Sequence, residues 1–165
     1  MGIRLLPRTL PELYAHALAM EREATRRFAE LECLMRDAGM DHLADEFQKI
    51  GGEEREQYEA LALGTSGREL PRLREWEYAW HYLGSGADRV RAPKSAREAL
   101  ALALATERRT QCFYADVAQN APDDAVCAFA AEMATDEQRH VTRLELLLSR
   151  EPEPAAPEDD SATLA

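Results

Sequence analysis

In four stretches of this chain, mostly apolar residues recur at alternating spacings of three and four positions and so form a row, here called a lane. Each lane is interrupted near its middle by one glutamate. Residues at such spacings share one face of a helix, so each lane is expected to face a common core. The four interrupting residues are Glu21, Glu54, Glu107 and Glu137. The pattern predicts four amphipathic helices that pack together with a layer of acids buried across their middle.

Capping residues indicate where these helices begin and end. Residues 9–12 (TLPE) and 95–98 (SARE) each fit a capping box, in which a hydroxyl and a glutamate three positions later satisfy free N–H groups of the first turn. We expect the first helix over about 10–38, ended by Gly39, and the second from the N-cap Asp41 to about Gly64. The third begins at the second capping box, and the fourth follows residues 120–123 and ends near Arg150.

The connections between helices differ in length, and this difference predicts the topology. Short turns at residues 39–40 and 120–122 make the first and last pairs antiparallel neighbours. The long segment 65–94 predicts a crossover between the two hairpins, with its aromatic residues covering a flank of the bundle or a subunit interface. The expected fold is all-α, a four-helix bundle over residues 1–150, followed by a disordered acidic tail over 151–165.

Four buried carboxylates need a partner for their charge. An isolated buried carboxylate is costly, and four in one layer also repel one another. Two divalent cations would balance the four negative charges. Glu137 is followed three residues later by His140, and a glutamine, Gln57, takes the matching place after Glu54. Carboxylates with imidazole suit iron or manganese, so the combination predicts a dinuclear metal site.

Each of these residues also has a plainer interpretation. A single glutamate in a lane is about as often a surface residue, assigned to the wrong face of its helix, as a metal ligand. A lone histidine on an apolar face is more often a hydrogen-bonded core residue than a ligand. The three cysteines, Cys33, Cys112 and Cys127, are expected to be small core residues. An internal repeat favours the metal site, because the first and third helices share one pattern around the glutamate and the second and fourth share another.

Charge and hydropathy exclude several classes of partner. The formal net charge of −11 argues against a nucleic-acid partner and against docking on anionic lipid. No stretch is apolar enough for a membrane span, and residues 1–10 lack the apolar run of a secretory signal. The expected location is therefore cytoplasmic.

The acids and their neighbours resemble the rubrerythrin branch of the ferritin-like superfamily over about residues 10–148. The residues that carry the resemblance are Glu21 with Phe28, Glu54, Glu107 with Tyr114, and Glu137 with His140. The resemblance implies a ferritin-like bundle with two iron ions, for which manganese or zinc are possible substitutes. It implies a reaction with hydrogen peroxide or dioxygen, and it assigns the metal ligands to these glutamates and the histidine.

Two residues depart from the family pattern. Gln57 stands where many relatives have a histidine, and it offers only a weak carbonyl ligand. Thr110 stands where rubrerythrins often have a further glutamate, which puts their redox-linked ligand exchange in doubt. Glu53 and Glu56 are expected on other faces of their helix and therefore to be poor substitutes, and His81 in the crossover is a remote candidate.

The chain also lacks the pair of C-x-x-C motifs of the iron–sulfur module that many rubrerythrins carry. We therefore expect electrons from a separate donor protein, with Tyr114 as a hydrogen-bonding catalytic residue or a packed core residue. A homodimer is the expected assembly. The alternatives are a ferroxidase that handles iron as ferritins do, and a non-catalytic metal-binding helical module.

Overall fold

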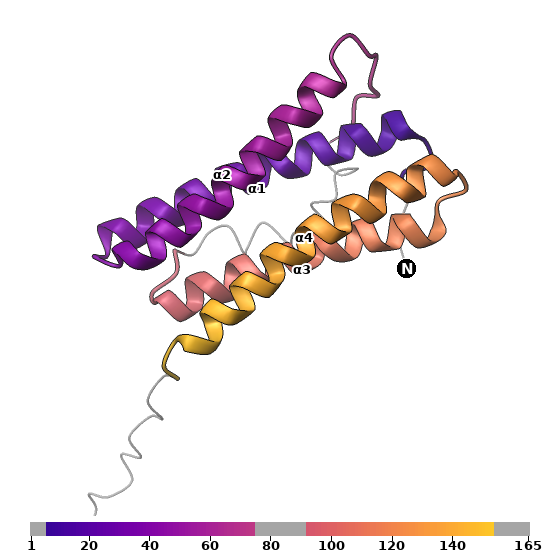
Figure 1. Cartoon of the computed structure of the whole chain (residues 1–165). Coiled ribbons are helices and arrows are strands. Elements are labelled where there is room, and N and C mark those ends of the chain that lie inside the picture. Colours follow the sequence, from indigo (N-terminus) through magenta and orange to yellow (C-terminus); the bar gives the residue numbers. More distant parts are fainter. Residues whose placement is uncertain (1–5, 75–91, 154–165) are drawn as a thin grey trace, which may run out of the picture.

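The computed structural model describes residues 6–74 and 92–153, and this part of the chain contains four helices and no strand. The helices are α1 (Leu10–Asp37), α2 (Asp41–Gly64), α3 (Ala96–Asn120) and α4 (Asp124–Arg150). They form two antiparallel hairpins, α1 with α2 and α3 with α4, which lie against each other in one bundle (Figure 1). The predicted all-α four-helix bundle is confirmed.

Both predicted capping boxes form at the starts of their helices. The Thr9 hydroxyl accepts a hydrogen bond from the backbone N–H of Glu12 at 3.3 Å, and the Ser95 hydroxyl accepts one from Glu98 at 3.1 Å. Each glutamate in turn accepts a backbone N–H from the residue just before the cap, at 2.8 Å for Glu12 and 2.7 Å for Glu98. These polar side chains fix α1 and α3 at the positions that the sequence indicated.

The turn between α1 and α2 differs from expectation in one detail. Gly39 has a φ of 74°, the left-handed conformation that glycine adopts without strain, and it follows the end of α1 as predicted. Asp41 is the first residue of α2 and not its N-cap, which is Met40 and makes no side-chain cap hydrogen bond. Asp41 instead places a carboxylate in the first turn, where the helix dipole favours negative charge.

The apolar core has two parts, and the acids lie between them along every helix. One part is centred on Phe47 and Leu100, and the other on Leu13 and Tyr114. The lane residues Glu21 and Phe28 of α1 do face the core, and the buried face of this helix also includes Leu13 and Met20. The site is therefore a polar layer enclosed by apolar side chains on both sides.

The three cysteines do not fill the core. Cys33 and Cys112 are exposed and Cys127 is partly buried, so the expectation that all three are small core residues is wrong. In the described part of the chain, no helix is long and apolar enough to cross a membrane.

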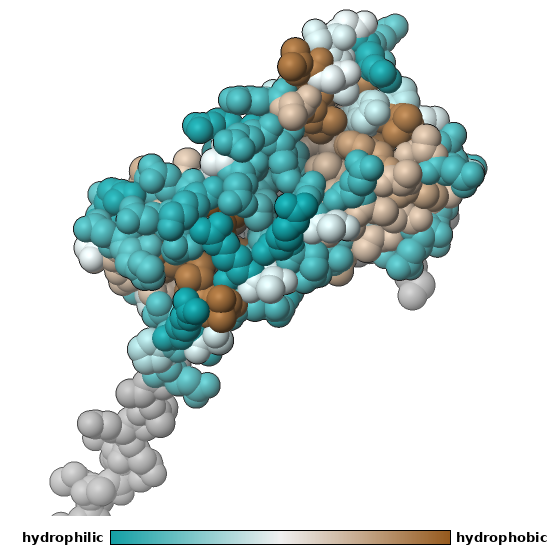
Figure 2. Space-filling model, in the orientation of Figure 1, coloured by the Kyte–Doolittle hydropathy of each residue, from teal (hydrophilic) through white to brown (hydrophobic). Residues whose placement is uncertain are grey.

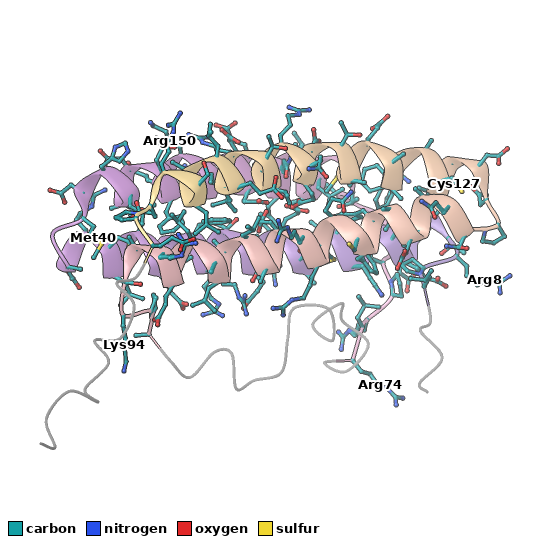
Figure 3. The ribbon with its side chains drawn as sticks, turned by 90° about the horizontal axis from the view of Figure 1, so that it is seen from below. Arg8, Met40, Arg74, Lys94, Cys127 and Arg150 are labelled. Atoms are coloured by element: carbon teal, nitrogen blue, oxygen red, sulfur yellow. The ribbon has the colours of Figure 1, made fainter. Side chains whose placement is uncertain are left out.

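The described ends of the long connection lie far apart along the bundle. Arg74, after α2, and Lys94, before α3, lie at opposite ends of the molecule (Figure 3), as a crossover between two hairpins requires. The aromatic residues of the crossover and His81 lie outside the described residues, as does most of the acidic tail.

A glycine on α2 allows the two helices of the first hairpin to approach closely. A Cβ atom at Gly51 would lie 2.9 Å from the Cβ of Phe28, closer than real Cβ atoms come. We expect Gly51→Ala to destabilise the protein by about 1–2 kcal/mol in chemical denaturation, because overpacking of this α1–α2 contact outweighs the gain in helix propensity. Gly52→Ala is the matched control, because a Cβ there has no neighbour within 4 Å. It should stabilise the protein by about 0.5–1 kcal/mol, and equal effects of the two changes would contradict the close packing.

Candidate metal centre

Four of the predicted ligands meet in the buried layer. Glu54 from α2, Glu107 from α3, and Glu137 and His140 from α4 each offer one ligand atom, and these atoms all lie within 4.8 Å of one another. All four side chains are buried. Because Glu137 and His140 are three positions apart, one face of α4 presents both toward the acids of the other helices.

Glu21, on α1, belongs to the same buried layer but is not one of these four clustered residues. It is buried, and its Oε1 accepts a hydrogen bond of 3.0 Å from the phenol of Tyr114 on α3. Tyr114 is itself buried, so its hydroxyl is satisfied by the carboxylate and not by water. The predicted contact between Tyr114 and a carboxylate of the site is therefore present.

The carboxylates of this layer have more buried acceptor atoms than the described residues have donors directed at them. Four carboxylates contribute buried oxygens without an assigned hydrogen bond, and the nitrogen that faces them is Nδ1 of His140. These oxygens are Oε2 of Glu21 and Glu107 and both oxygens of Glu54 and Glu137. Buried acceptors in folded proteins are normally hydrogen-bonded, and several unsatisfied ones in a single layer are exceptional. Such a cluster fits a bound cation.

The spacing and chemistry of the group also fit a metal ion. Ligand atoms about 2.1 Å from an ion are at most about 4.2 Å apart, so the spread of the four atoms is close to what one ion requires. Nδ1 of His140 lies 2.7 Å from Oε1 of Glu54 and 3.5 Å from Oε2 of Glu107. The ring thus presents this nitrogen to the acids, as a ligand of iron, manganese or zinc would be presented.

Burial and mutual repulsion make the acids reluctant to ionise. Burial raises the pKa of Glu54 well above its usual value, and the charges of Glu107 and Glu21 raise it further. The pKa of Glu137 is raised for the same reasons, by burial and then by the charges of Glu54 and Glu107. Burial also raises the pKa of Glu21, although hydrogen bonding to Glu54 and Tyr114 opposes the change. A metal ion that replaces the protons would balance the charge of the ionised acids and so remove their mutual repulsion.

His140 and Tyr114 respond to the same negative surroundings. Burial alone lowers the pKa of His140, but hydrogen bonding to Glu107 and the charges of Glu137 and Glu107 raise it to about 9. Burial, followed by the charge of Glu21, raises the pKa of Tyr114 well above 10. Tyr114 therefore remains a protonated hydrogen-bond donor at any pH at which the protein would work.

Gln57 follows Glu54 on α2 as His140 follows Glu137 on α4, and its amide oxygen is a weaker ligand than an imidazole. Gln57 is partly buried, and its amide oxygen is buried without a hydrogen-bond donor among the described residues. This oxygen is free to accept a weak bond to a cation, but Gln57 does not belong to the group of four. Thr110 is buried with its hydroxyl donating to the backbone oxygen of Thr106 at 3.2 Å. The two ends of the site are therefore chemically unequal.

One residue beside the site departs from expectation. Glu53 was expected to lie on another face of α2, and its side chain is indeed half exposed, yet Oε2 of Glu53 lies 3.0 Å from Nε2 of His140. Glu53 therefore contacts the ring of His140 although its side chain is half exposed. Lane spacing alone could not reveal this contact, because it involves the outer edge of the histidine.

Comparison with known proteins agrees with this arrangement. A family model described as Rubrerythrin matches residues 12–148. The crystal structure of an uncharacterized conserved protein from Magnetospirillum magnetotacticum MS-1 is similar, with a TM-score of 0.80 and 27% sequence identity over 90% of this chain and 99% of that one. No protein with a curated description matches the chain.

Proposed function

The chain belongs to the rubrerythrin family, and from this premise we propose that it is a di-iron oxidoreductase that reduces hydrogen peroxide or dioxygen. The observation that carries the proposal is the buried group of Glu54, Glu107, Glu137 and His140, with its unsatisfied carboxylate oxygens. Glu21 and Gln57 would complete the ligands of the second metal. Manganese or zinc could occupy the same ligand set.

The side chains of the bundle would perform three tasks. The carboxylates bind and neutralise the cations, and the apolar clusters on both sides exclude water from the layer. Tyr114 orients Glu21 through its 3.0 Å hydrogen bond and keeps a proton close to the reacting centre. Ferrous iron, when bound, would supply the electrons for reduction of the oxidant.

Two further parts of the proposal concern partners. The given sequence has no C-x-x-C pair that could form an iron–sulfur module, so we propose a separate electron-donor protein. We also propose a homodimer in the cytoplasm. Size-exclusion chromatography with light scattering tests the assembly, and a large shell in place of a dimer would favour iron storage by the alternative ferroxidase activity.

The inequality of the two halves favours a second candidate function. Gln57 and Thr110 stand where stronger ligands are expected, so a single tightly bound metal without productive redox chemistry fits these two residues. The protein would then be a non-catalytic metal-binding module. Oxidant consumption separates the candidates, since only the di-iron enzyme would oxidise two ferrous ions for each molecule of peroxide.

The experiment that tests the proposed function is an anaerobic titration of metal-free protein with ferrous iron, followed by one equivalent of hydrogen peroxide per site. We expect close to two iron ions per chain, one bound firmly and one loosely, and rapid oxidation of both by peroxide. Elemental analysis that finds no bound iron after the titration would overturn the proposal. One firmly bound iron that peroxide does not oxidise would favour the non-catalytic module.

The weaker half of the site should respond to a single substitution. We expect Gln57→His to raise the affinity for the second metal by about tenfold, because imidazole is a much better ligand than an amide oxygen. Isothermal titration with ferrous or cobalt ions measures both binding steps. Gln48→His adds the same ring at an exposed position of α2 and should leave both steps unchanged. Two equal binding steps in the wild-type protein would contradict the inequality.

A further inference from the structure

The two carboxylate oxygens of Glu53 contact residues on another helix. Oε2 of Glu53 lies 3.0 Å from Nε2 of His140, and Oε1 accepts a hydrogen bond of 3.3 Å from Nη1 of Arg143. Both partners belong to α4, whereas Glu53 belongs to α2. The contact therefore crosses the boundary between the two hairpins, directly beside the buried layer.

The geometry of the ring places Glu53 outside the group of ligands. Nδ1 of His140 faces the buried acids, at 2.7 Å from Oε1 of Glu54, while Nε2 faces Glu53. The two nitrogens of an imidazole point in diverging directions, so an oxygen bonded to Nε2 cannot share a cation with Nδ1. When a metal replaces the proton on Nδ1, the remaining proton stays on Nε2 and is donated to Glu53, and the lone pair of Nδ1 is directed at the metal among the acids.

Arg143, which donates to Glu53, is itself held by a second acid on α2. Arg143 donates from Nε and Nη2 to Oε2 of Glu46, at 3.1 Å and 2.9 Å, and Lys49 donates to the other oxygen of Glu46 at 3.0 Å. Burial opposes ionisation of Glu46, but Lys49 and Arg143 keep its pKa below the usual value. Arg143 is therefore anchored by a charged partner while it reaches Glu53. Mostly hydrophilic side chains cover the surface over the first half of α2 and the second half of α4 (Figure 2).

We propose that Glu53 is a positioning residue for the metal ligand His140, and that Arg143 and Glu46 keep Glu53 in place for this role. Glu53 fixes the tautomer and orientation of the ring, so that Nδ1 already points toward the metal position before the metal binds. The hydrogen bond to Glu53 also makes Nδ1 more basic and therefore a stronger ligand for the cation. The inference rests on the proposed metal site. It gives α2 two roles, since Glu54 would bind the metal and Glu53 would hold the ligand His140 of α4.

The competing interpretation is an ordinary surface ion pair, which typically contributes little. The difference in exposure argues against it, because the Glu53 side chain is 52% exposed whereas that of His140 is 5% exposed. The histidine is buried and its outer nitrogen contacts Glu53, whereas an ordinary surface pair would not involve a ring directed into the acid layer. An ion pair without a positioning role would also leave metal binding unchanged when it is removed.

The test uses Co²⁺ as the probe, because its visible absorption bands report the geometry and ligands of the metal. Metal-free wild type, Glu53→Ala, Glu53→Gln and the control Glu56→Ala are titrated with Co²⁺, and melting of each metal-free protein is measured. Glu56 lies exposed on the same helix, so its removal changes the charge of α2 equally.

We expect Glu53→Ala to weaken binding of the first Co²⁺ by about 10–100-fold and to shift its absorption bands, as loss of an outer partner of a metal-bound histidine does. Glu53→Gln keeps an acceptor oxygen for Nε2 and should recover most of the affinity and the wild-type bands. Glu56→Ala should match wild type, and all metal-free proteins should melt at similar temperatures.

Equal affinity and identical bands for Glu53→Ala and Glu56→Ala would overturn the positioning role while leaving the metal site intact. A Glu53→Ala protein that binds weakly only because its metal-free form has lost its cooperative melting would also overturn it, since the effect would then be structural. Absence of Co²⁺ binding by the wild-type protein would overturn the proposed metal site, and this inference with it.

Discussion

Without metal, the protein should lose stability steadily as the pH rises from about 5 to about 9. Glu21, Glu54 and Glu137 have raised pKa values in the folded protein, so the folded state binds more protons than the unfolded chain above the ordinary carboxyl pKa. His140, with a pKa of about 9 against 6.5, adds stability that is complete below pH 6.5 and lost as the pH passes 9. The charges that raise the pKa of His140 are those of the same acids, so the histidine and the carboxylates contribute to this pH dependence together.

Metal should reverse this dependence, because a cation binds the deprotonated ligands of the folded protein. Urea unfolding at several pH values, with a chelator and with excess Co²⁺, measures both effects. Glu54→Gln removes one buried charge and should make the metal-free protein more stable at pH 8, whereas Glu56→Gln, on the exposed face of α2, should change little. Equal stability of the metal-free wild type at pH 5.5 and pH 8.5 would contradict the burial of unpaired acids.

Loss of one buried ligand should nearly abolish metal binding. We expect Glu137→Gln to lower the affinity for the first metal by more than about 100-fold, beyond the range typical of outer partners, because a charged ligand of the cluster is lost. The amide has nearly the shape of the carboxylate, so the bundle should still fold. Competition with a coloured chelator measures the affinity, and peroxide-dependent oxidation of iron should fall with it.

The matched control for this substitution is Glu132→Gln, at an exposed position on the same helix. It removes the same charge from α4 and should leave metal binding within about twofold of wild type, as expected of a surface substitution. Wild-type affinity in Glu137→Gln would show that the metal, if any, binds elsewhere in the protein.

The fold could be predicted from sequence because the signals for it are local. Capping residues such as Thr9 and Ser95 act within one turn, and lane spacing reports which face of a helix is buried. The acids of the layer could be found for the same reason, since a buried glutamate interrupts an apolar lane. The roles of these residues as ligands stay a prediction until a metal is measured.

The features that sequence reasoning missed depend on distances between elements. Glu53 contacts His140 from outside the apolar lane of α2, and whether such a contact forms depends on the spacing of α2 and α4. The buried face of α1 is also wider than a single lane, since it includes Leu13 and Met20 beside Glu21 and Phe28. Cys33 and Cys112 are exposed although cysteine is commonly buried, since residue preference is weaker than helix phase.

The distribution of the acids between the two hairpins has a consequence for how the chain folds. Each hairpin joins helices that are adjacent in sequence, so its contacts are local and should form early, within microseconds to milliseconds. Docking of the hairpins then brings Glu21 and Glu54 against Glu107 and Glu137, and like charges oppose this last step at neutral pH. Metal or protons should therefore accelerate docking, and a newly made chain short of metal would remain longer as two separate hairpins with their apolar faces open to aggregation.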